Sequence, residues 1–92
     1  MPRKMKALPS PSLAEPLTAH LLGQVIRARR TQLGLRIDTA AGLCGVAKET
    51  LMKLEHGHTS THLDKLLQIC QALGIQLRVL PWNIEESTDD WH

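Results

Sequence analysis

The stretch that decides the fold of this chain runs from residue 41 to residue 57 and is AGLCGVAKETLMKLEHG. Its first four residues close a short apolar helical pattern that begins near Ile37, and Gly45 supplies the conformational freedom that a tight turn needs. A second helical pattern follows over about Lys48 to Glu55, with leucines on its apolar side. Two short helices joined by a glycine turn are typical of the helix-turn-helix motif.

Side-chain size explains the spacing within this motif. The small Ala41 allows the two helices to approach closely, and Val46 and Leu51 hold the second helix at a fixed angle. The outward positions of the second helix are then free to enter a DNA major groove, and we take them as candidate contacts: Lys48, Glu49, Thr50 and Lys53. The alternative for Lys48 and Lys53 is an ordinary solvated helix surface, for Thr50 a packing role, and for Glu49 helix capping.

Two further helices flank the motif. Thr18 is the expected N-cap of a helix from about His20 to Leu33, which Gly34 ends. After a polar loop, a leucine-rich helical pattern ends at Gly74, with Thr59 or Ser60 as its expected N-cap. The hydroxyls of that loop are candidate phosphate contacts: Thr59, Ser60 and Thr61.

The segment Ile75–Leu80 alternates apolar and polar residues and ends at Pro81, which predicts a β-strand. A single strand cannot pair its own backbone groups or bury its apolar side. A second copy of the same strand would meet both needs, so the sequence predicts a symmetric dimer. The expected dimer contacts are Ile75, Leu77, Val79 and Trp82.

The two ends of the chain differ from its centre in composition. Residues 1–17 hold four of the five prolines and three basic residues, which predicts a flexible basic arm. Residues 18–82 form the expected DNA-binding and dimerisation domain. Residues 83–92 hold four carboxylates and no core-forming pattern, which predicts a disordered acidic tail in which Trp91 is a candidate contact for a partner protein.

Charge and composition narrow the classes of function. Nine of the eleven lysines and arginines lie in the first 53 residues, a distribution that favours a polyanionic partner. We find no Ser/His/Asp set, phosphate-binding glycine loop or metal-ligand spacing, although His56, His58 and His62 lie close in sequence, so we expect no enzyme, metal or cofactor. Cys44 and Cys70 are expected to be buried thiols. No segment is apolar enough to span a membrane, so we expect a cytoplasmic protein.

The residues GVAKETLMKLEHG at 45–57, together with Gln32–Leu35, resemble the XRE/Cro-type family of repressors, and the likeness extends over about residues 20–73. The resemblance implies a mainly α, lambda-repressor-like bundle of four to five short helices, binding operator DNA with an inverted repeat as a homodimer. The helix ending Gln71–Gly74, followed directly by a strand, is similar to HipB-like antitoxins. That likeness implies a repressor of its own operon in the bacterial cytoplasm, nucleoid-associated when bound to DNA, with a HipA-like kinase toxin as partner.

The resemblance also implies a structural ion pair between Arg30, near the end of the first helix, and Glu55, at the end of the third. The chain departs from the family at the start of the second helix, where a DNA-contacting Gln is usual and Arg36 and Ile37 stand instead. We expect Arg36 to supply a phosphate contact there. A stand-alone regulator without a toxin, and a protein-only adaptor on a degenerate motif, stay open as alternatives.

Overall fold

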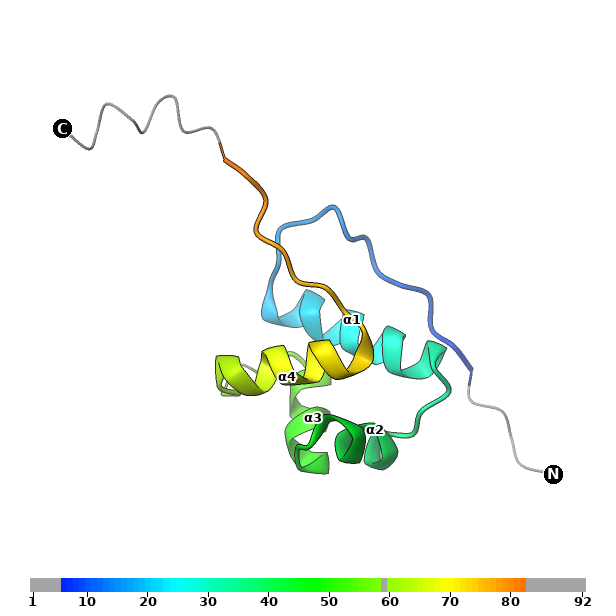
Figure 1. The fold of residues 1–92 in the computed structure, drawn as a ribbon. Helices are drawn as coiled ribbons and strands as arrows, with labels where there is room; N and C mark the ends of the chain where they lie inside the picture. The colour runs from blue at the N-terminus through cyan, green and yellow to red at the C-terminus, as the bar shows by residue number, and fades with distance from the viewer. Residues whose placement is uncertain (1–5, 59, 83–92) are drawn as a thin grey trace.

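The computed structural model describes residues 6–58 and 60–82, which form four helices and no strand (Figure 1). The helices are α1 (Ala19–Gln32), α2 (Ile37–Cys44), α3 (Lys48–Glu55) and α4 (Leu63–Leu73). The expected mainly helical bundle is confirmed, with four helices where four to five were expected. None of these helices has both the length and the hydropathy needed to cross a bilayer.

Local signals set most of the helix ends. The Thr18 hydroxyl accepts a hydrogen bond from the backbone N–H of Leu21 at 3.0 Å, as expected of an N-cap. Gly45 and Gly74 end α2 and α4 in the left-handed conformation, each with φ of 74°. The expected cap of α4 is wrong: its N-cap is His62, whose side chain makes no capping hydrogen bond.

The core is aliphatic and draws on all four helices. Ile26 of α1, Ala40 of α2, Leu51 of α3 and Ile69 of α4 have no exposed surface. Figure 1 shows α1 and α4 lying over the α2–α3 pair. Leu51 and Leu54 of α3 are buried in this core, so the opposite face of α3 must point toward solvent.

α1 approaches the end of α3 closely at Gly23. A Cβ atom at Gly23 would stand 2.5 Å from the carbonyl oxygen of Leu54 and 2.8 Å from that of Glu55. Such contacts are far shorter than van der Waals distance, so only glycine allows this packing.

Two long side chains join helix ends to distant elements. Gln68 of α4 donates through Nε2 to the carbonyl oxygen of Cys44 at 2.6 Å, which satisfies a terminal carbonyl of α2. Arg29 of α1 donates through Nε to the carbonyl oxygen of Leu73 at 2.8 Å, at the end of α4. Arg29 is half-buried and binds within the protein.

The expected strand over Ile75–Leu80 does not form in the single chain. Ile75 packs against the core, and its N–H donates to the carbonyl oxygen of Cys70 at 2.8 Å. Beyond it the segment borders a groove beside α1, and its apolar side chains stay exposed, with Val79 83% and Trp82 70% exposed. The physical reason is that a β-ladder requires a second strand, and no other described segment of the chain pairs with this one.

Candidate nucleic-acid interface

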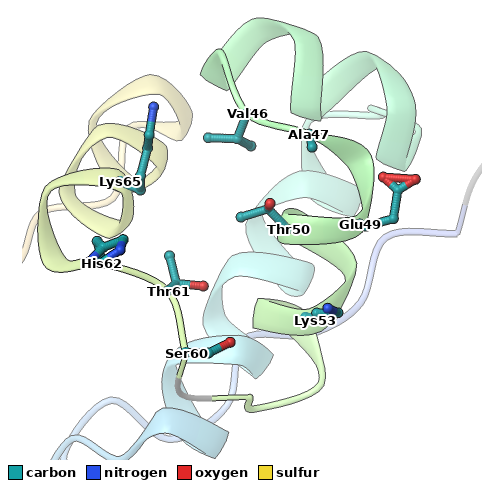
Figure 2. Close-up of a pocket in the computed structure, with 9 residues that line it drawn as sticks. All are labelled: Val46, Ala47, Glu49, Thr50, Lys53, Ser60, Thr61, His62 and Lys65. Atoms are coloured by element: carbon teal, nitrogen blue, oxygen red, sulfur yellow. The ribbon is translucent and has the colours of Figure 1, made fainter.

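A shallow groove of about 320 Å³ opens between α3 and the start of α4 (Figure 2). Its floor and walls come from the helix-turn-helix turn, from α3, and from the loop and first turn of α4. We call it the recognition groove and define it by its lining residues: Val46, Ala47, Glu49, Thr50, Lys53, Ser60, Thr61, His62 and Lys65.

The α3 wall carries three of the four residues that sequence reasoning placed on it. Glu49 and Lys53 are exposed along the outer side of α3, and Thr50 is half-buried with its side chain toward the groove (Figure 2). Lys48 is exposed at the first position of α3 but does not line the groove. Because Leu51 is fully buried on the other side of the helix, α3 cannot rotate these side chains away without opening the core.

The opposite wall combines expected and unexpected residues. Ser60 and Thr61 line it as the sequence suggested, while Thr59 lies outside the described residues. His62 and Lys65 also line it, and sequence reasoning did not place them in the DNA contact set. Lys65 sits in the first turn of α4, outside the helix-turn-helix motif itself. Its spacing alone gives no signal, because only the packing of α4 beside α3 brings it there (Figure 2).

The electrostatics of the groove favour an anionic ligand. Two lysines and one carboxylate line it, namely Lys53, Lys65 and Glu49. Both α3 and α4 begin at the groove, and in the described structure the side chains of their N-caps, Ala47 and His62, make no capping hydrogen bond. The positive end of the helix dipole at these two starts attracts phosphate oxygens, although in α4 the backbone N–H of Lys65 already donates to Oδ1 of Asp64 at 2.8 Å.

The Arg30 and Glu55 side chains form a bidentate ion pair that joins α1 to the end of α3. Arg30 donates through Nε to Oε2 of Glu55 at 2.6 Å and through a terminal nitrogen to Oε1 at 3.0 Å. A third bond, to the carbonyl oxygen of Leu35, is 2.9 Å long. The side chains are only 11% and 4% exposed. This geometry fixes the crossing of α1 and α3, and Arg30 does not line the recognition groove.

The remaining candidates lie elsewhere. Arg36 is the N-cap of α2, exposed and outside the groove, and its side chain makes no capping bond. Trp91 falls outside the described residues. Within residues 6–58 and 60–82, no three His, Cys, Asp or Glu side chains gather as a metal-ion site would require.

The order and geometry of these elements agree with the comparison to known families. The sequence profile of the helix-turn-helix family, HTH_3, matches residues 26–80, which include the whole of α2, α3 and α4. This chain belongs to the helix-turn-helix family. The matched region of this helix-turn-helix protein contains every residue of the recognition groove and ends within the C-terminal segment.

Two relatives of this helix-turn-helix protein have regulatory names. An uncharacterised HTH-type transcriptional regulator from Sinorhizobium fredii, y4mF, is 34% identical over 59 residues, covering 64% of this chain and 78% of the relative. The crystal structure of the clp gene regulator ClgR from C. glutamicum is similar with a TM-score of 0.57 and 31% identity, covering 67% of this chain and 80% of that one.

Proposed function

We propose that this protein is a sequence-specific DNA-binding transcriptional regulator that inserts α3 into the major groove. The observation that carries the proposal is the recognition groove: α3 is anchored by Leu51 and Leu54 on one side and presents polar side chains on the other. Both relatives are named as regulators, which supports a regulatory function here.

Within this proposal the residues divide into two roles. Lys48, Glu49, Thr50 and Lys53 reach base edges or nearby phosphates, because they are polar residues on the outward side of α3, the helix that enters the DNA major groove. Thr59, Ser60, Thr61 and Lys65 hold the phosphate backbone on the α4 side, and Arg36 holds it at the start of α2. Arg30 and Glu55 keep α3 at its angle without touching DNA.

The test is to select a preferred DNA sequence from a random library and measure its affinity at several salt concentrations. Lys53→Ala is expected to weaken binding by about 1–3 kcal/mol and relax preference at one base pair if Lys53 reads a base. Lys65→Ala is expected to weaken all sequences equally and reduce the salt slope by about 0.9. Arg27→Ala, at an exposed position of α1 outside the recognition groove, is the charge-matched control. Failure of the wild-type chain to prefer any sequence would overturn the proposal in favour of a protein-only adaptor.

The regulator is proposed to act as a homodimer joined through Ile75–Leu80, reading an inverted repeat with half-sites about 10 bp apart. A groove of about 720 Å³ between α1, residues 10–17 and residues 74–80 supports this proposal, because Leu77 and Leu80 line it and stay exposed in the single chain. Leu77→Pro is expected to give a monomer in sedimentation, since it removes a ladder donor and an apolar contact together. A full dimer in that variant would rule out the strand.

The finer proposal is that the regulator represses its own operon as the antitoxin of a HipBA-like pair. It rests on the layout of helices followed by an apolar extended segment and on the acidic composition of residues 83–92. Trp91 is proposed to anchor a HipA-like kinase toxin, at about 2 kcal/mol or more. Truncation after Asn83 is expected to abolish toxin capture and spare operator binding. If the truncated chain still captures the toxin at full strength, Trp91 does not bind it. If no toxin gene lies beside the gene of this protein, a stand-alone regulator is favoured.

A further inference from the structure

Three histidines lie close together in sequence, and the structure separates them. His56 is the C-cap of α3, with its Nδ1 2.7 Å from the carbonyl oxygen of Met52. His58 follows in the loop, and neither residue lines the recognition groove. His62 does line it, at the N-cap of α4 (Figure 2). Among the histidines that the structure describes, His62 is therefore the one that belongs to the proposed DNA-binding site.

The packing of α4 fixes the position of His62. Its carbonyl oxygen accepts a hydrogen bond from the N–H of Leu66 at 3.0 Å, which is the first hydrogen bond of the helix. Ile69 and Leu73 bury the same helix in the core. The side chain of His62 is exposed and, in the described structure, makes no capping hydrogen bond. The imidazole is thus carried into the groove wall by an anchored helix.

The charged groups around His62 come from both walls of the groove. Lys53 and Glu49 line it on α3, and Lys65 lines it on α4. Asp64 is also in the first turn of α4, where its Oδ1 accepts a hydrogen bond from the N–H of Lys65 at 2.8 Å. Two lysines against one carboxylate give the groove lining a charge of +1, and a protonated imidazole raises it to +2. Protonation of His62 therefore changes the charge of the groove by a large fraction.

A phosphate oxygen distinguishes the two protonation states of an imidazole. The neutral ring has one N–H donor and one nitrogen that only accepts, whereas the protonated ring has two donors and a positive charge. Histidine is the side chain whose charge ordinarily changes between about pH 5 and 8. Hydrogen bonds that involve a charged partner are roughly twice as strong as neutral ones. A phosphate in the recognition groove therefore favours the protonated form of His62.

We propose that His62 takes up a proton when DNA phosphates occupy the recognition groove, so that affinity for DNA rises as the pH falls through neutrality. The inference rests on the proposed DNA binding and adds a regulation of the same groove. The sign follows from linkage: if the complex binds more protons than the free chain, lowering the pH favours the complex. Because the imidazole meets a phosphate rather than a base edge, the base preference does not change with pH.

The test measures binding of the full chain to its selected DNA duplex at several salt concentrations, at about pH 5.5 and about pH 8.0, the two sides of the histidine range. The salt slope is expected to be steeper at the lower pH by up to about 0.9 per chain, since one more charged group contacts phosphate. Affinity is expected to be about fivefold higher per chain there, which is the difference between a charged and a neutral hydrogen bond.

Three variants separate His62 from the other titratable groups. His62→Gln cannot be charged and is expected to bind weakly at both pH values, without the difference in salt slope. His62→Lys carries a fixed charge and is expected to keep the low-pH affinity at both. His20→Gln, at an exposed position of α1 outside the recognition groove, is the matched control and is expected to keep the wild-type pH dependence. Circular dichroism and the melting temperature verify that each variant is folded.

Proton NMR of the His62 ring gives the direct measurement. We expect the midpoint of its titration to move to higher pH when the duplex is added. An unchanged midpoint, or a His62→Gln variant with the full wild-type pH dependence, would overturn the inference while leaving the proposed function in place. A wild-type chain that binds no DNA at either pH would overturn the proposed function and the inference with it.

Discussion

The guanidinium of Arg29 and the carbonyl oxygen of Leu73 lie 2.8 Å apart, although 44 residues separate them in sequence. This bond places a positive charge at the negative end of α4, where unpaired carbonyls and the helix dipole both favour a cation. It also ties α1 to the point where the C-terminal segment begins. Arg29 therefore holds the start of the proposed dimer segment in position.

Replacing Arg29 with Met is expected to destabilise the domain by about 1–2 kcal/mol, because the terminal carbonyl loses a charged donor. In a domain of this size that corresponds to a fall in melting temperature of several degrees. Arg27→Met, at an exposed position two residues earlier, is the control and is expected to change stability by less than about 0.5 kcal/mol. Equal melting temperatures for the two variants would show that the Arg29 bond contributes nothing.

The two glycines inside helices are expected to respond to alanine in opposite directions. Gly23→Ala pushes a methyl group into the carbonyl oxygens of Leu54 and Glu55, so we expect a loss of about 1–3 kcal/mol. Gly42→Ala meets nothing within 4 Å, so the gain in helix propensity of about 0.5–1 kcal/mol is expected to appear in full. Urea unfolding of both variants measures this difference. A neutral Gly23→Ala would mean that α1 can move away from α3.

Because Arg30 and Glu55 form one ion pair, we expect the effects of their substitutions on the free energy of unfolding to be non-additive. Arg30→Met leaves a nearly buried carboxylate without its partner and is expected to cost about 3–5 kcal/mol. The double variant Arg30→Met/Glu55→Leu removes both charges and is expected to regain most of that loss. Thermal melting of both single variants and the double variant completes the cycle. An unaltered melting curve in Arg30→Met together with lost DNA binding would make Arg30 a DNA contact.

The two thiols predict a stability change at alkaline pH. Burial raises the pKa of the Cys44 thiol. Burial also raises the pKa of the Cys70 thiol, and the charge of a Cys44 thiolate nearby raises it further. The unfolded chain therefore releases these protons at lower pH than the folded chain, so stability is fully present below about pH 8.5 and falls as pH rises through the folded values. Native labelling by a thiol reagent is expected to be slow and to accelerate on unfolding. The Cys44→Ala/Cys70→Ala variant is expected to lose this part of the pH dependence, and rapid labelling of the native chain would contradict the prediction.

The positions of the helices can be predicted from the sequence because the residues that start, end and bury a helix lie within or next to it. Thr18 as a cap, the glycine turn at Gly45 and the leucine period of α3 each act within one or two helical turns. The start of α4 is harder to predict because several polar residues of the preceding loop can cap a helix, whereas the residue at the N-cap is His62, whose side chain makes no capping hydrogen bond. The strand was misplaced in the single chain because a period-two pattern indicates a capacity to pair, and pairing requires a second strand.

The helix-turn-helix between Ala41 and Gly57 and the outward side of α3 follow from the sequence alone, because hydrophobic period and turn residues act over short distances. Packing between helices is what places Lys65 and Lys53 around one groove, requires glycine at position 23 beside α3, and holds Leu8 at Thr31 and Gln32 at the end of α1. Each of these relations joins residues far apart along the chain. Such contacts follow from how helix surfaces fit together, and no local pattern encodes that fit.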